Sequence, residues 1–136
     1  MGATTAATAS GWLDQIRFDD RGLVTVVAQD AGSGRVLMVA WADREAVAET
    51  VATKRAVYWS RSRKRIWRKG EESGHFQAVS DVRLDCDGDV VLYRVRPEGG
   101  VACHTGRESC FYRRLEDGQW VVTDKMLDSP EGPSPR

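Results

Sequence analysis

Apolar and polar positions alternate over several short stretches of the chain, a pattern typical of half-buried β-strands. The first two stretches are residues 23–28 and 35–41, and the turn-forming residues 30–34 lie between them. This arrangement predicts a β-hairpin. Further strands are predicted at 56–60, at 76–86 and 90–96 around the tight turn Asp87-Gly88, and at 111–115 and 119–122 as a last hairpin.

One segment has a helical rather than an alternating pattern. Asp43 is a candidate N-cap with Glu45 in the first turn, and Val47 and Val51 are spaced four apart. We therefore expect a short helix that ends near Lys54. Residues 61–74 are highly charged and are predicted to form a long, exposed excursion. The predicted fold class is α+β: a β-rich single domain of antiparallel hairpins with one or two short helices.

The two ends of the chain differ in composition from the rest. Residues 1–11 are predicted to be a flexible tail, 12–127 the folded domain, and 128–136, which are rich in proline, a disordered tail. The first ten residues have neither a basic lead-in nor an apolar run, so we expect no signal peptide and no membrane anchor. The expected location is the cytoplasm.

Charge is balanced overall but uneven locally. Twenty Lys and Arg against twenty Asp and Glu give a net charge of zero, which argues against a general attraction to nucleic acid or membranes. Residues 54–69, however, contain eight basic and no acidic residues. Four aspartates follow within residues 81–89. These two stretches indicate one place that binds anions and another that binds a cation.

The three cysteines carry the most informative chemistry. Cys86, Cys103 and Cys110 are separated by sixteen and then six residues, which is not the paired spacing of a zinc ribbon. Three thiolates would leave one position open on a tetrahedral zinc ion, as in catalytic zinc sites. The simpler alternative is that they are small buried side chains, and Cys86, in phase with Val82 and Leu84, suits that reading. His104, next to Cys103, could carry a proton or be a fourth ligand.

Carboxylates surround the first cysteine. Asp85, Asp87 and Asp89 occupy alternate positions around a hairpin turn, and Mg²⁺ binds such oxygens while it keeps some of its waters. Aspartate and glycine are also ordinary turn formers, so a solvated turn is the alternative. The overlap with Cys86 favours a second metal close to the first.

The basic stretch contains aromatic and hydroxyl side chains as well. A set of this kind can hold phosphate oxygens and stack on a purine. The same composition could bind RNA, or it could be a plain solvated loop. The residues that we expect to contact a substrate are Trp59, Ser60, Arg61, Ser62 and Lys69.

Four motifs in succession resemble those of the phosphoribosyl-AMP cyclohydrolase family. They are YWSRSR at 58–63, WRKGEESGHFQ at 67–77, DCDGD at 85–89 and ACHTGRESCFYR at 102–113. The likeness runs in one order from Leu37 to Arg114. Glu72 departs from it, because a small hydroxyl residue is expected there. Only 21 residues follow Leu115, so the resemblance is to the form with a single activity.

The resemblance implies a homodimer, with intertwined subunits that share each zinc ion. The residue matching Cys86 would come from one subunit, and those matching Cys103 and Cys110 from the other. Asp85, Asp87 and Asp89 match the family's magnesium ligands.

The resemblance also implies a reaction, the third step of histidine biosynthesis. Zinc-dependent hydrolysis opens the adenine ring of 1-(5-phosphoribosyl)-AMP and gives the formimino-aminoimidazole carboxamide ribotide intermediate. Attack at carbon 6 of the purine is the chemistry of the zinc deaminases, except that here the ring nitrogen leaves. Protons must move between the attacking water and that nitrogen, and His104 is the first candidate for this role, with His75 the second.

Two other classes of protein remain open from the residues alone. A zinc-stabilised RNA-binding module would use the basic stretch and close the zinc site with His104. A thiol redox protein would need two cysteines close enough to form a disulfide.

Overall fold

A computed structural model describes residues 11–127, and the tails predicted at 1–11 and 128–136 lie outside these residues except for Gly11. The elements in chain order are η1 (Trp12–Gln15), β1 (Leu23–Asp30), β2 (Val36–Asp43), α2 (Arg44–Thr53), β3 (Val57–Ser60), β4 (Arg65–Arg68), β5 (Gln77–Leu84), β6 (Val90–Pro97), η2 (Glu98–Gly100), β7 (Arg113–Glu116) and β8 (Gln119–Val122). The predicted class is confirmed, since the chain is mostly β-strand with one α-helix. Within the described residues, no helix combines the length and the apolar character that crossing a bilayer requires.

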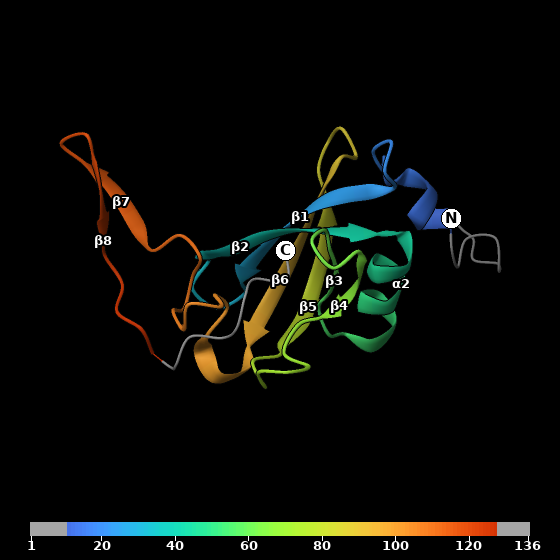
Figure 1. Ribbon diagram of the computed structural model, residues 1–136. Coiled ribbons are helices and arrows are strands. Elements are labelled where there is room, and N and C mark those ends of the chain that lie inside the picture. The colour runs from blue at the N-terminus through green and yellow to red at the C-terminus, as the bar shows by residue number, and fades with distance from the viewer. Residues whose placement is uncertain (1–10, 128–136) are drawn as a thin grey trace.

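Six strands form one sheet in the order β4-β3-β2-β1-β6-β5 (Figure 1). The predicted hairpins β1–β2 and β5–β6 are both present and antiparallel. The two hairpins meet through β1 and β6, which run parallel from Thr25↔Val90 to Asp30↔Val95. Sequence alternation did not predict this parallel pairing, because it joins strands that are far apart in the chain.

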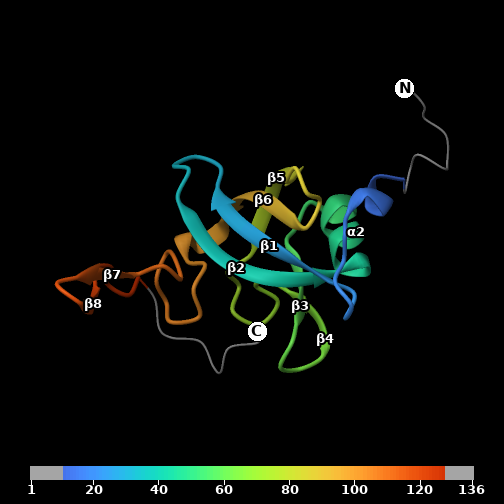
Figure 2. The same cartoon turned by 90° about the horizontal axis from the view of Figure 1, so that it is seen from above.

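The predicted helix forms where expected. The Asp43 carboxylate accepts a hydrogen bond from the Ala46 backbone N–H at 2.8 Å, which confirms it as the N-cap. The helix ends at Lys54, whose φ of 61° is left-handed. Thr50 is buried and links the helix to β3, because its hydroxyl accepts from the Val57 N–H at 2.9 Å. Figure 2 shows α2 beside the end of β2, from which the chain continues into the helix.

The charged stretch 61–74 is exposed at most of its positions, as predicted, but it is not a simple excursion from the sheet. It contains β4, which pairs with β3 from Val57↔Arg68 to Ser60↔Arg65. Lys69 and Gly70 are buried, and a Cβ on Gly70 would lie 2.4 Å from the Phe76 backbone nitrogen. The prediction missed this strand because Ile66 and Trp67 pack partly buried on the core, while the neighbouring cations, Arg65 and Arg68, remain exposed.

The core lies on the sheet and beneath α2. Its largest fully buried side chains include Tyr58 and Tyr93, whose rings are 5.6 Å apart. The Tyr58 hydroxyl donates to the buried Gln77 side-chain oxygen at 2.6 Å. These contacts join β3, in one half of the sheet, to β5 and β6 in the other half, without help from the last hairpin.

The β7–β8 hairpin stands apart as a two-stranded arm (Figures 1 and 2). Apolar side chains on and beside this arm are exposed, and Trp120 keeps 67% of its accessible surface. The others are Phe111, Leu115, Val121 and Val122. Trp120 therefore projects into solvent in the single chain.

Candidate active site

The three cysteines lie at opposite ends of β6. Cys86 belongs to the turn that precedes this strand, and Cys103 and Cys110 belong to the loop that follows it, residues 101–112, which we call the cysteine loop. Eight strand residues separate the two places, or about 26 Å at the usual rise. Within residues 11–127, no three Cys, His, Asp or Glu side chains converge except Asp85, Asp87 and Asp89. The three sulfurs therefore do not meet inside one chain.

Cys103 and Cys110 do lie together. A hydrogen bond from Cys110 is the largest influence on Cys103 and helps to lower its pKa from 9.0 to about 5, although burial opposes the shift. The Thr105 hydroxyl, 3.0 Å from the Cys103 sulfur, and the nearby His104 act in the same direction. Cys103 is therefore a thiolate at neutral pH, which is the protonation state that binds zinc.

Cys86 is exposed, so the alternative that placed it in the core is wrong. The pairing register of β5 shifts between Val79 and Asp81, and the outer part of the strand leaves the core. Leu84 accordingly keeps 40% of its surface. The Cys86 thiol is accessible to another molecule.

The turn at residues 85–89, which we call the acidic turn, holds carboxylate oxygens of Asp85, Asp87 and Asp89 within 4.8 Å of one another. Desolvation and then the Asp85 carboxylate raise the pKa of Asp89, as expected for like charges held close together. The backbone N–H groups of Asp89 and Val90 donate to Asp85 at 3.0 and 3.2 Å. A Cβ on Gly88 would come within 2.9 Å of the Gln15 carbonyl oxygen, so the N-terminal segment fits only a glycine here.

The predicted substrate contacts fall into two groups. Trp59, Ser60, Arg61 and Ser62 lie at the end of β3 and in the turn after it. Trp59 pairs with Trp41 of β2, and the Arg61 guanidinium lies 3.4 Å from the centre of the Trp41 ring. The Ser60 and Ser62 hydroxyls are 3.4 Å apart. This group offers hydroxyls and a cation side by side.

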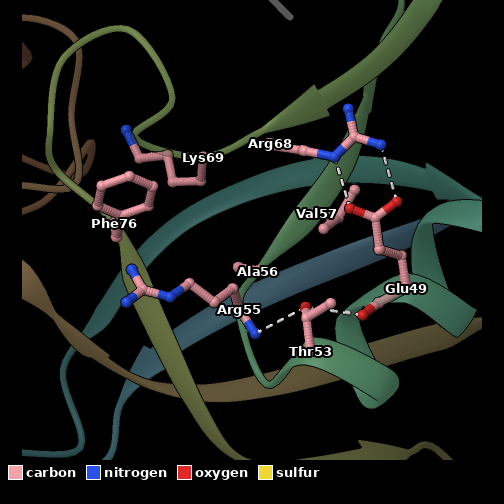
Figure 3. Close-up of a pocket in the computed structure, with 8 residues that line it drawn as sticks. All are labelled: Glu49, Thr53, Arg55, Ala56, Val57, Arg68, Lys69 and Phe76. Atoms are coloured by element: carbon pink, nitrogen blue, oxygen red, sulfur yellow. Dashed lines mark hydrogen bonds and ion pairs between the residues drawn. The ribbon is translucent and has the colours of Figure 1, made fainter.

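Lys69 lies at the other end of β4, beside a pocket of about 200 Å³ (Figure 3). Arg68 in the same pocket is bound by Glu49, with its Nε 2.5 Å from one carboxylate oxygen and its Nη2 2.9 Å from the other. Arg55 lies over the Phe76 ring at 4.6 Å. Lys69 is 3% exposed, and it follows the end of β4 opposite to the turn that contains Arg61.

Both histidines lie at the end of the sheet that holds the cysteine loop. His104 is half-buried inside that loop, next to Cys103. His75 precedes β5, whose first residue Gln77 pairs with Pro97 at the end of β6. A Cβ on Gly99 would lie 3.1 Å from the His75 ring, so the ring packs against the turn that leads into the cysteine loop.

Sequence reasoning missed the residues that hold the cysteine loop in place. Ser109 is fully buried, and its hydroxyl donates to the Val36 carbonyl at 2.9 Å and accepts from the Phe111 N–H at 2.9 Å. Arg35 binds Glu108 and Asp124, and its hydrogen bond holds the pKa of Asp124 below the usual value. No local pattern marks Arg35, because its partners lie 73 and 89 residues away.

A comparison with known protein families covers the candidate site residues described above. The sequence profile of the phosphoribosyl-AMP cyclohydrolase family matches residues 38–112. That span contains all three cysteines, the acidic turn, both histidines and the basic stretch.

Similar full-length proteins are named phosphoribosyl-AMP cyclohydrolase. The protein from Bordetella petrii is 62% identical over 128 residues, which cover 91% of this chain and 96% of that protein. The one from Chromobacterium violaceum is 58% identical, with 92% and 95% covered. The one from Methylococcus capsulatus is 62% identical, with 90% and 95% covered. The chain therefore belongs to the phosphoribosyl-AMP cyclohydrolase family of enzymes.

Proposed function

We propose that this enzyme hydrolyses phosphoribosyl-AMP in histidine biosynthesis, opening the adenine ring with the help of zinc held by Cys86, Cys103 and Cys110. The observation that carries the proposal is the contact between Cys103 and Cys110, which lowers the pKa of Cys103 to about 5. Paired sulfurs with thiolate character are donors that suit zinc. Zinc held by three thiolates would bring a water molecule whose pKa is lowered toward neutrality.

The third sulfur comes from a second copy of the chain. Cys86 is exposed on its turn and about 26 Å along β6 from the other two. In a homodimer the acidic turn of one subunit would meet the cysteine loop of its partner. The exposed apolar side chains of the β7–β8 arm support this arrangement, because burial against a partner would remove them from water.

Proton transfer is assigned to His104, with His75 as the second candidate. His104 adjoins Cys103 and is half-buried, which supports a role in moving protons between a zinc-bound water and solvent. His75 is more buried and packs on Gly99. Replacing His104 by alanine would leave zinc bound and lower turnover about a hundredfold if it carries the proton.

The substrate carries two phosphates, and the two basic groups would bind them. Ser60, Arg61 and Ser62 would hold one phosphate from the β3–β4 turn, and Trp59 would lie along the purine. Lys69 would bind the other phosphate from the far end of β4.

Magnesium would bind Asp85, Asp87 and Asp89. Their oxygens already lie within 4.8 Å of one another, and a cation would relieve the charge repulsion that adds to desolvation in raising the pKa of Asp89. If the carboxylates bind Mg²⁺, Asp87→Asn will weaken the magnesium dependence of the rate.

The direct test measures zinc content and absorbance-monitored turnover of phosphoribosyl-AMP, with and without a zinc chelator. Cys103→Ser is expected to lose zinc and activity together. Near-normal turnover in that variant would rule out the zinc mechanism.

Mixing two inactive variants tests whether the site is shared. When Cys86→Ser and Cys103→Ser subunits are mixed, each mixed dimer regains one intact site, so activity returns to about one quarter of the wild-type value. Mixing Cys103→Ser with Cys110→Ser is the matched control, because both changes then fall on the same side of every site and nothing is regained. Equal recovery in both mixtures, or none in either, would mean that the site is not divided between subunits as proposed.

The contact between Cys103 and Cys110 also meets the requirement of the redox alternative, that two cysteines lie close together. The two functions differ in the state of the thiols. Zinc bound with both thiols reduced supports the hydrolase, whereas a disulfide and no metal in freshly prepared protein supports the redox protein.

A further inference from the structure

The cysteine loop has no regular secondary structure, so hydrogen bonds must set the distance between its two thiols. Within the loop, the backbone N–H groups of Ala102 and Cys103 donate to Glu108 and Arg107, both at 3.1 Å. The Gly106 N–H returns to the Cys103 carbonyl at 2.9 Å. These bonds fold residues 102–108 into a tight turn with Cys103 near its start.

The inner side of the loop is attached to β2. The Cys110 N–H donates to the Leu37 carbonyl at 2.7 Å, and the Ser109 hydroxyl donates to the Val36 carbonyl at 2.9 Å. Cys110 is therefore attached to the six-stranded sheet through β2, the strand that begins directly after Arg35.

The outer side of the loop is covered by the segment that follows β8. The Leu127 N–H donates to the Gly106 carbonyl at 2.7 Å, and the Arg107 side chain donates to the Asp124 carbonyl at 2.9 Å. The cysteine loop thus lies between β2 and residues 123–127, which are far apart in the sequence.

Arg35 joins the two sides with one side chain. Its Nη1 lies 2.6 Å from a Glu108 carboxylate oxygen, and its Nη2 lies 2.5 Å from an Asp124 carboxylate oxygen. The side chains of Arg35, Glu108 and Asp124 keep 36%, 37% and 19% of their surface, so all three are only partly open to solvent. A planar guanidinium can bind two carboxylates in fixed directions, which a lysine ammonium does not do.

We infer that Arg35 is a positioning residue of the metal site: through Glu108 and Asp124 it holds the cysteine loop in the shape that presents Cys103 and Cys110 together. This inference rests on the proposed zinc function. We call Arg35 with its two carboxylate partners, Glu108 and Asp124, the clamp. Without the clamp, the loop would have to be ordered when metal binds, and the cost of that ordering would appear as a weaker affinity for the metal.

Cobalt is the probe, because tetrahedral Co²⁺ bound to thiolates has visible d–d bands and a near-ultraviolet thiolate-to-cobalt charge-transfer band. The metal-free full-length protein is titrated with Co²⁺, and zinc is then measured by competition with a chelator. Arg35→Gln is expected to weaken cobalt binding about tenfold, the lower end of the range for residues that orient metal ligands. Arg35→Lys is expected to recover part of the loss, because an ammonium can bind one of the two carboxylates.

The matched control is Arg44→Gln, which removes the 2.8 Å ion pair between Arg44 and Asp14 at the opposite end of β2 from Arg35. It should leave cobalt affinity and the spectrum unchanged. Glu108→Gln removes only one side of the clamp and should give a smaller loss in the same direction, so it replaces Arg35→Gln if that variant does not fold. Urea unfolding of each variant separates a loss of metal affinity from a loss of folded protein.

Wild-type cobalt affinity in Arg35→Gln, or an equal loss in Arg44→Gln, would overturn the inference. Cys103→Ser separates this failure from a failure of the proposed function. If Cys103→Ser no longer binds cobalt while Arg35→Gln binds normally, only the positioning role is wrong. If Cys103→Ser binds cobalt as well as wild type does, the zinc site and the clamp both fail.

Discussion

The six-stranded sheet and the β7–β8 arm differ in how far their apolar side chains are exposed to solvent. In the sheet, Val26, Leu37 and Tyr93 are fully buried. In the arm, Leu115 and Trp120 keep 56% and 67% of their surface, and no element of the sheet covers them. The sheet completes its own core, whereas the arm requires another surface to cover its apolar residues. This difference makes the hairpin the surface that the proposed dimer would cover.

The largest expected effect contrasts two leucines. Leu37→Ala in the sheet is expected to lower the free energy of unfolding by about 3 kcal/mol, because it leaves a cavity in a closed core. Leu115→Ala in the arm is the matched change at an exposed site, and we expect a much smaller loss. Urea unfolding at one fixed protein concentration measures both, and equal losses would contradict the division between sheet and arm.

The next effect concerns the arm itself. Trp120→Ser is expected to weaken dimerisation by about 2 kcal/mol, or roughly 30-fold, the cost typical of a buried aromatic at an interface. Sedimentation velocity over a range of protein concentrations measures the dissociation constant. A wild-type chain that stays monomeric at every concentration would mean that the exposed residues do not serve self-association.

A smaller effect is expected at the start of α2. Asp43→Ala removes the N-cap bond to Ala46 and should cost about 1 kcal/mol of folding stability. Because α2 packs on the sheet, the same change should leave the dimer dissociation constant unaltered. A dimerisation defect in Asp43→Ala would show that the sheet and the arm are not independent.

The smallest signal is the ionisation of a single thiol in the loop between these regions. In metal-free protein, the thiolate absorbance lost in Cys103→Ser should appear around pH 5 rather than near 9, since the pKa of Cys103 is lowered chiefly by Cys110. The folded chain holds the thiolate more readily than the unfolded chain, so this contribution to stability is complete above the unfolded pKa and is lost as pH falls toward 5. A midpoint near 9 would mean that the two thiols do not interact in solution.

Much of the fold could be predicted, because local rules apply where neighbours in sequence are neighbours in space. The turn between β1 and β2 and the N-cap at Asp43 are cases of this kind. β4 was missed because Arg65 and Arg68 flank its two apolar residues and conceal the strand. The parallel β1–β6 pairing was missed because the sequence of neither strand indicates which distant strand it pairs with.

The candidate site shows the same limit. Counting cysteines and matching motifs selected Cys103 and Cys110, and the structure brings them together. It does not bring Cys86 to them. This agrees with the resemblance, which implied that Cys86 and the other two cysteines come from different subunits. Arg35 has no sequence signal, because its role exists only after three distant segments have met.

The parallel pairing of β1 with β6 can form only after β6 has been synthesised. Thr25 leaves the ribosome 65 residues before its partner Val90, so one edge of β1 stays unpaired while nearly half of the chain is made. An open strand edge is a place where other nascent chains can add. Since long-range strand pairing also slows folding, this interval is the stage at which we expect a chaperone to recognise the chain.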